Sequence, residues 1–128
     1  MSGIQKIPIQ PKYIQEDGLV VIDSLRPELP FKVEVLQFVT LPPKAIGGNH
    51  KHPRTEAFLA LSKGLEFHWQ DENGKSHIES LAPNEIIAVS PSTPHGVTNT
   101  SAAAASVVEW ADAIQYDVVP SDVIRTKE

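Results

Sequence analysis

The sequence predicts an all-β domain, a sandwich or a barrel, and three observations support this fold class. About eight or nine short stretches are rich in strand-forming residues, and turn residues separate them every six to twelve positions or so. The 11 prolines and 7 glycines fit a chain with many turns. No stretch sustains the hydrophobic period of an amphipathic helix. With 128 residues, the chain is long enough for one domain with a buried core and leaves little room for a second.

The longest predicted strand covers residues 31–40, after a shorter one over residues 19–23. In the longer strand alternation places Val35, Gln37 and Val39 on one face, so a polar side chain lies among apolar neighbours. Gln37 is therefore a candidate for contact with a ligand inside the domain.

Shorter strands follow in the second half of the chain. The Asn73-Gly74 pair stands between two alternating stretches, which is a strong local signal for a β-hairpin. A tight loop is expected over residues 91–94. The predicted strands cover residues 56–61, 65–70, 76–82, 86–90, 95–99 and 105–110.

The two ends of the chain show no clear period. We expect an N-terminal arm over residues 1–18, either loose or added as an edge strand to a partner. The β domain then covers residues 19–120, and residues 121–128 form a C-terminal tail.

Composition excludes several classes of function. The formal net charge of −5 argues against nucleic acid or an anionic membrane as a partner. There are no cysteines, so nitrogen and oxygen atoms must bind any metal ion. The chain has neither a signal-type apolar run at its start nor a stretch long enough to span a membrane, and we expect a cytoplasmic protein.

The residues that carry chemical information lie between Gly48 and Glu56. Positions i and i+2 of a strand share a face, so His50 and His52 present two imidazoles to one side. Glu56 keeps the same parity, with a turn expected at Pro53, while His95 must come from a later strand. Two or three imidazoles and a carboxylate suit a divalent ion such as Zn, Fe, Mn or Ni, and they leave coordination positions open.

Two motifs resemble those of the cupin superfamily. The His-x-His-x-x-x-Glu run from His50 to Glu56, followed by Gly64, resembles the first cupin motif. The segment at residues 84–99 resembles the second, with histidine and asparagine four positions apart at its end. The resemblance covers roughly residues 45–110. It implies a double-stranded β-helix, or jelly-roll, barrel, with a metal ion held by His50, His52, Glu56 and His95.

Within the cupins, the first motif and residues 29–33 and 115–117 resemble the nucleotide-sugar branch, which includes keto-sugar isomerases and the cupin domains of capsular-sugar enzymes. Gly47 and Phe38 stand where such isomerases carry an arginine and a tyrosine. Asn84 and Ser92 stand where the second motif often has glycine, and asparagine tolerates a positive φ.

This resemblance leaves three functions open. The first is proton transfer next to a carbonyl on a sugar or nucleotide-sugar, giving an isomer or epimer. His50 and His52 then act as metal ligands or, without a metal, as catalytic acid and base, and Gln37 and Arg54 bind substrate. The second is an iron or manganese dioxygenase with the same ligands. The third is a non-catalytic module that binds metal or sugar. In each case we expect a small sugar-like ligand and a homodimer.

Overall fold

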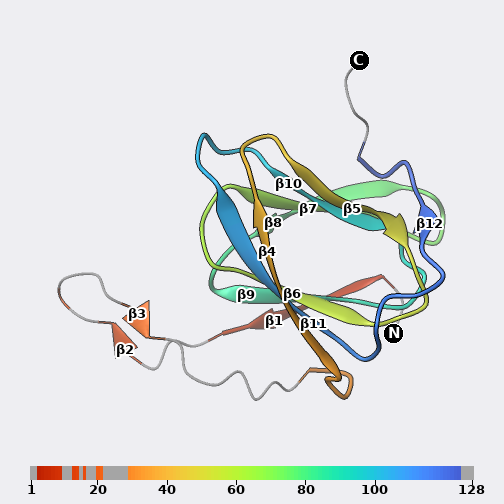
Figure 1. Ribbon diagram of the computed structural model, residues 1–128, viewed down its shortest axis with the longest axis horizontal. Coiled ribbons are helices and arrows are strands. Elements are labelled where there is room, and N and C mark those ends of the chain that lie inside the picture. The colour runs from red at the N-terminus through yellow and green to blue at the C-terminus, as the bar shows by residue number, and fades with distance from the viewer. Residues whose placement is uncertain (1–2, 10–12, 15, 17–19, 22–28, 125–128) are drawn as a thin grey trace.

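Two antiparallel five-stranded sheets face each other and enclose the interior of the protein (Figure 1). The computed structural model describes residues 3–9, 13–14, 16, 20–21 and 29–124, and these contain strands but no helix. No helix able to cross a membrane is found in this part of the chain. The prediction of an all-β barrel is confirmed.

The first sheet has the strand order β1 (Ile4–Pro8), β9 (Glu85–Val89), β6 (Glu56–Ala60), β11 (Ala105–Ala111) and β4 (Val35–Leu41). The second has the order β12 (Val119–Pro120), β5 (Ile46–Lys51), β10 (His95–Asn99), β7 (Leu65–Gln70) and β8 (Ser76–Leu81). A separate pair is formed by β2 (Tyr13–Ile14) and β3 (Val20–Val21).

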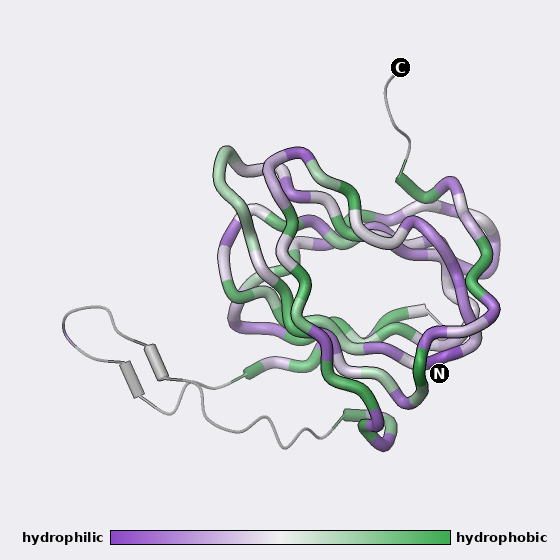
Figure 2. The backbone as a smooth tube through the Cα atoms, in the orientation of Figure 1, coloured by the Kyte–Doolittle hydropathy of each residue, from purple (hydrophilic) through white to green (hydrophobic). Residues whose placement is uncertain are grey.

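The first sheet carries apolar residues on both faces, because alternate residues of its strands enter two different hydrophobic clusters. Phe58 of β6 packs between the sheets, where Phe67 of β7 meets it with the ring centroids 5.3 Å apart. Leu59, the next residue of β6, packs on the outer face instead. The hydropathy colouring shows this contrast, since the first sheet is rich in hydrophobic segments whereas β5 is mostly polar or neutral (Figure 2). A polar site can therefore form where β5 faces the first sheet.

The long strand begins later than its sequence pattern predicts. β4 starts at Val35, not at residue 31, because its partner β11 ends at Ala111, opposite Val35. Beyond that point the backbone N–H of Glu34 still donates to the carbonyl of Ala111 at 2.9 Å, and the pairing then stops. The predicted alternation is confirmed within β4, where Gln37 is half-buried and its neighbour Phe38 is 72% exposed.

The N-terminal segment also differs from expectation. Residues 4–8 form β1, which pairs with β9 of the same chain from Ile4↔Val89 to Pro8↔Glu85. Ile4 packs against the inner cluster and Ile7 against the outer one, so each face of β1 has an apolar contact. Of the strand predicted at 19–23, only Val20–Val21 lies within the described residues.

The chain after β12 is anchored to β5. The Asn49 side chain donates to the carbonyl of Ile124 at 3.0 Å and accepts the N–H of Ile124 at 2.9 Å. Val123 and Ile124 are buried. The first four residues of the predicted tail therefore pack on the second sheet, and residues 125–128 lie outside the described part.

Two turns bear directly on the predicted motifs. Asp71 accepts hydrogen bonds from the backbone N–H of Asn73 and Lys75, and Gly74 has a φ of 78°, which confirms the hairpin between β7 and β8. In the loop before β10, Ser92 has a φ of 62°, the left-handed conformation that glycine adopts most easily. Asn84 does not use a positive φ.

Candidate metal centre

The four predicted ligands meet where β5, β6 and β10 converge. His50 on β5 lies directly opposite His95 at the start of β10. His52 follows the end of β5, and Glu56 begins β6 in the other sheet. One ligand atom from each side chain lies within 4.8 Å of all the others. The structure thus brings together the four residues that the sequence singled out.

Close approach of β5 and β10 makes this geometry possible. A Cβ atom on Gly96 would lie 2.8 Å from the backbone nitrogen of Asn49, so only glycine fits there without a shift. The strand register is irregular between His95 and Gly96. As a result, the two histidines face each other at the end of the sheet, with ring centroids 5.2 Å apart.

The turn between His52 and Glu56 carries the chain from the second sheet to the first. Asp112 fastens this turn, because its carboxylate accepts the N–H of Thr55 at 3.0 Å and its own N–H donates to the carbonyl of Thr55 at 3.2 Å. The expected turn at Pro53 is therefore present, and tertiary contacts place Glu56 beside the histidines.

The atoms at the centre converge without forming hydrogen bonds to one another. Oε1 of Glu56 lies 2.7 Å from Nε2 of His52 and 2.9 Å from Nε2 of His95. These distances are short, yet Oε1 of Glu56 and Nε2 of His52 are both buried and have no hydrogen-bond partner of acceptable geometry. Buried polar atoms are nearly always partnered, and nitrogen and oxygen atoms pointing at one place are arranged as ligands of a cation are. The side chains present therefore fit a divalent metal ion.

The surrounding contacts fix the orientation of these ligands. Nδ1 of His95 lies 2.8 Å from the carbonyl oxygen of Thr93, which directs Nε2 of the same ring toward Glu56. Oε2 of Glu56 accepts a hydrogen bond from Arg54 at 2.7 Å, so Oε1 remains free for the centre. Arg54 is only 4% exposed and also donates to the carbonyl of Ala113 at 3.1 Å.

The charge states of the ligands suit metal binding. Burial is the largest cause that lowers the pKa of His50 to about 4, and repulsion from His95 and His52 adds to it, so this imidazole is neutral at pH 7. For Glu56, burial alone would raise the pKa, but the adjacent His52 and His95 outweigh burial and hold the pKa well below its usual range. Glu56 is therefore an anion at every physiological pH.

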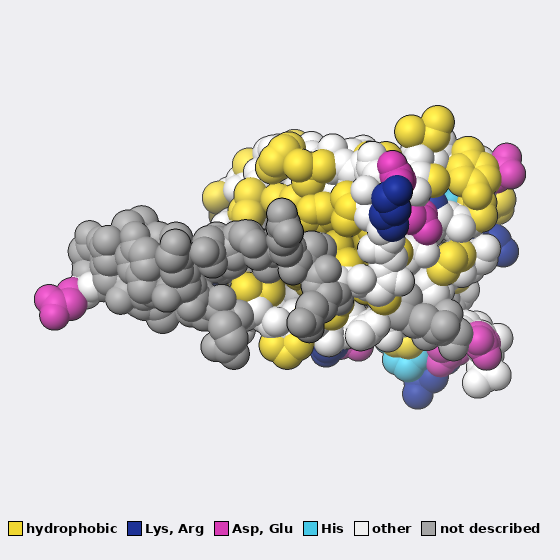
Figure 3. All heavy atoms as spheres, turned by 90° about the horizontal axis from the view of Figure 1, so that it is seen from below, with side chains coloured by type: hydrophobic (Ala, Val, Ile, Leu, Met, Phe, Trp, Pro, Cys, Tyr) yellow, Lys and Arg dark blue, Asp and Glu magenta, His cyan; other side chains and the backbone are white. Residues whose placement is uncertain are grey.

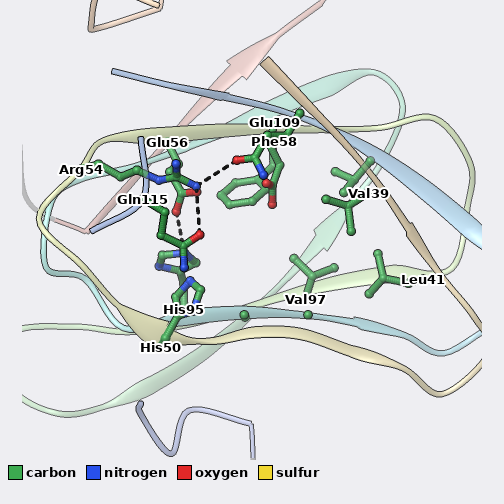
Figure 4. A pocket seen from close by; sticks show the side chains of 15 residues that line it. Val39, Leu41, His50, Arg54, Glu56, Phe58, His95, Val97, Glu109 and Gln115 are labelled. Atoms are coloured by element: carbon green, nitrogen blue, oxygen red, sulfur yellow. Dashed lines mark hydrogen bonds and ion pairs between the residues drawn. The ribbon is translucent and has the colours of Figure 1, made fainter. Parts of the chain in front are cut away.

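A cavity of about 180 Å³ opens beside the centre, between the two sheets (Figure 4). His50, Glu56 and His95 line it, while the side chain of His52 is completely shielded from solvent and lies behind them. The far end of the cavity is apolar and is formed by Val39, Leu41, Val97 and Val107. The space thus offers a polar reacting end and a hydrocarbon end.

Both predicted substrate-binding residues line this cavity. The side-chain oxygen of Gln37 accepts a hydrogen bond from Arg54 at 3.2 Å, and Gln115 approaches the same guanidinium at 3.5 Å (Figure 4). The guanidinium of Arg54 is thus shared among protein groups. That Gln37 and Arg54 bind substrate remains a prediction.

Glu109 is a residue of the cavity to which the sequence analysis assigned no role. It lies on β11 opposite Gln37 and Phe58, and its side chain lines the cavity. Its pKa is raised to about 7, mainly by burial; the negative charge of Glu56 adds to this rise, and Arg54 and His95 oppose it. Its side chain points between the sheets because Glu109 lies on the same face of β11 as Ala105 and Val107, which are buried in the inner cluster.

The two positions that depart from the sugar-isomerase pattern lie in different surroundings. Gly47 lines the cavity, where an arginine side chain would reach into it. Phe38 is exposed on the outer face of β4, so a tyrosine at this position would point away from the cavity.

Solved structures of low sequence identity share this fold. The QdtA 3,4-ketoisomerase from Thermoanaerobacterium thermosaccharolyticum, a double mutant in complex with TDP, superposes with a TM-score of 0.75 at 15% identity, covering 93% of this chain and 88% of that one. The WlaRB TDP-quinovose 3,4-ketoisomerase from Campylobacter jejuni gives a TM-score of 0.74 at 12% identity, covering 94% and 95%. The capsular polysaccharide assembling protein CapF from Staphylococcus aureus gives 0.64 at 15% identity, covering 90% of this chain and 33% of that chain.

These likenesses confirm the predicted resemblance to sugar-isomerase cupins at the level of the fold. A comparison with curated proteins found no match. The sequence profile described as Cupin domain matches residues 37–111, which is more than half of the chain. The protein therefore belongs to the cupin domain family.

Proposed function

We propose that this cupin binds a divalent metal ion and acts as an isomerase or epimerase next to a carbonyl on a sugar or nucleotide-sugar. The observation that carries the proposal is the convergence of buried, unpartnered ligand atoms from His52 and Glu56 beside a cavity. The fold shared with enzymes described as sugar 3,4-ketoisomerases supports the substrate class.

In this proposal His50, His52, Glu56 and His95 hold the metal. When bound, the ion would polarise the substrate carbonyl and stabilise the negative charge that develops on its oxygen. The burial of His52 behind the centre supports its role as a ligand over a role as acid or base, because a substrate in the cavity would not reach it.

The size and lining of the cavity support a small reacting group. A volume of about 180 Å³ is below the range of roughly 300–1,000 Å³ that is usual for sites that bury a whole drug-sized ligand. We therefore propose that the sugar ring enters and that any nucleotide remains outside. Hydrogen-bonding groups of Gln37 and Gln115 meet the hydroxyls, while Val39 and Val97 contact the hydrocarbon side of the ring.

Metal analysis combined with solvent exchange tests this function. Protein purified without chelators is expected to carry about one divalent ion per chain. Incubated in deuterium oxide with a panel of 4-keto nucleotide-sugars and free keto-sugars, it should incorporate deuterium next to the carbonyl. If no member of the panel exchanges under any metal condition, the proposed isomerase function is wrong.

The same ligand set favours one alternative, an iron or manganese dioxygenase. Three histidines and a glutamate beside an open cavity also suit redox metals. Oxygen consumption by the iron-loaded protein with one of the panel substrates would favour this alternative. Tight ligand binding with neither exchange nor oxygen consumption would favour a non-catalytic binding module, to which the glycine at position 47 also points.

We also propose a homodimer and a cytoplasmic location. The outer face of the first sheet carries exposed apolar side chains, with Leu36 54%, Phe38 72% and Leu61 55% exposed. Figure 3 views the molecule from the side of this sheet and shows hydrophobic side chains gathered there. Apolar clusters of this kind often mark contact surfaces, and a second copy of the chain is the partner that we propose. Cell fractionation tests the location.

A further inference from the structure

We propose that Glu109 is the catalytic residue that moves the substrate proton in this cavity, a role that sequence reasoning gave to the histidines. The inference rests on the proposed isomerase function. It names a further catalytic residue outside the ligand set.

Glu109 and two of the histidines reach the cavity from opposite walls. Glu109 extends from β11 in the first sheet, and His50 and His95 extend from β5 and β10 in the second (Figure 4). A substrate between the sheets therefore has His50 and His95 on one side and this carboxyl on the other. A proton can be removed from the face of the substrate that is turned away from the histidines.

Glu109 is free for this task, whereas the other titratable groups lining the cavity are not. His50, Glu56 and His95 belong to the ligand set, and Arg54 is held by Glu56, Gln37 and Ala113. By contrast, within the described part of the chain no hydrogen bond or ion pair involves the Glu109 carboxyl. Its surroundings come from neighbouring strands, with Gln37 on one side and Phe58 on the other.

The electrostatic surroundings support a group that can both take up and release a proton. Burial and the negative Glu56 raise the pKa of Glu109 to about 7, while Arg54 and His95 oppose this rise. His50 also lines the cavity and is neutral at pH 7. A carboxyl that titrates near neutrality is suited to general acid–base catalysis, because both of its forms are present.

The step moves one proton and needs no external oxidant or reductant. The Glu109 carboxylate removes the proton from the carbinol carbon beside the carbonyl, and the electron pair of that C–H bond forms the C=C bond of an enediolate. The carboxylic acid then returns the proton to the former carbonyl carbon on the same face of the enediolate. The hydroxyl proton passes to the other oxygen, and a keto isomer results.

Two variants and a matched control test the role. Glu109→Gln keeps the shape of the side chain and removes its basicity, and it should lower kcat and the rate of solvent deuterium incorporation about 10²–10⁴-fold with KM nearly unchanged. Glu109→Asp keeps the carboxyl on a shorter side chain and should retain more activity than Glu109→Gln. Glu66→Gln changes a strand carboxylate outside the cavity and should match the wild-type protein.

Metal content and cooperative unfolding distinguish a loss of catalysis from a loss of folding or metal binding. All three variants should bind the wild-type amount of metal and unfold cooperatively, because none changes a ligand. If Glu109→Gln exchanges deuterium as fast as the wild-type protein, the inference about Glu109 is wrong while the proposed function stands. If the wild-type protein itself exchanges no member of the panel, the proposed function fails and this inference fails with it.

Discussion

Glu56 organises the centre at the scale of single residues, because its two carboxylate oxygens have different surroundings. Oε2 is bound to a buried guanidinium, and Oε1 faces two imidazoles. Arg54 therefore orients the carboxylate and offsets part of its charge without occupying the position where a cation would bind.

Replacing Glu56 by glutamine should affect both metal binding and stability. Glu56→Gln removes an anionic ligand and leaves the buried Arg54 without its counter-charge, so metal content should fall and the free energy of unfolding of the metal-free protein should fall by about 3 kcal/mol or more. Elemental analysis and urea unfolding measure the two effects. Glu79→Gln, a change at a more exposed ion pair with Lys6, serves as the control and should cost less than about 1 kcal/mol. Full metal occupancy in Glu56→Gln would contradict the assignment of this ligand.

Glu109 should make stability depend on pH. Because folding raises the pKa of this carboxyl from 4.5 to about 7, its contribution to stability is fully present below pH 4.5 and is lost as the pH rises through about 7. Glu109→Gln removes this loss, so the variant should gain stability relative to wild type between pH 4.5 and pH 8, by roughly 3 kcal/mol at most. Urea unfolding of both metal-free proteins at the two pH values gives this difference. An equal difference at both pH values would show that the carboxyl does not titrate as described.

At the scale of secondary-structure elements, Asn99 joins the end of β10 to its neighbours. Its side-chain nitrogen donates to the carbonyls of Leu41 and Ala103 at 2.9 and 2.8 Å, and its oxygen accepts the N–H and hydroxyl of Ser101. This side chain is almost completely buried and satisfies polar groups of the loop before β11. Since β11 carries Glu109, the asparagine of the second motif indirectly helps to place the cavity wall.

Removing this side chain should destabilise the barrel. Asn99→Ala leaves buried carbonyls without donors, and the free energy of unfolding should fall by about 2–3 kcal/mol. Asn73→Ala, in the exposed turn between β7 and β8, changes the same residue type at little cost and is the matched control. Urea denaturation of both variants measures the difference. Equal stability of the two variants would show that the hydrogen bonds of Asn99 contribute little.

At the scale of the whole molecule, the two sheets have different roles. The second supplies three of the four predicted ligands from β5, its C-terminal end and β10, and also Val97 of the apolar far wall; the first supplies Glu56, Glu109 and the rest of that wall. The site exists only when the sheets face each other. The outer face of the first sheet is the surface that we propose for assembly.

Assembly through that face predicts that charged substitutions at two exposed apolar residues have different effects on the oligomeric state. Phe38→Glu places a charge in the proposed interface and should shift the sedimenting species from two chains toward one. Ile78→Glu changes a residue that is 59% exposed on β8 of the other sheet, and it should leave the two-chain species unchanged. A wild-type protein that sediments as one chain at high concentration would contradict the proposed homodimer.

The sequence by itself determined the fold class, most strand positions and the four residues that converge at the candidate metal centre. These features are local or periodic: alternation defines strands such as β7, the Asn73-Gly74 pair marks its hairpin, and the spacing of His50, His52 and Glu56 is characteristic of a motif. Each can be recognised within about ten neighbouring residues, because side-chain direction and turn conformation depend on short-range sterics.

Only the tertiary structure decided how these residues act together. Partner strands determine where β4 begins and why residues 4–8 join the sheet of their own chain. Burial lets Arg54, which the sequence suggested only as a substrate-binding residue, hold the carboxylate of Glu56, and it gives Glu109 a pKa near neutrality. Burial and charge–charge contacts depend on residues that are far apart in the sequence. The motif therefore predicted a metal centre but gave no indication of the role of Glu109.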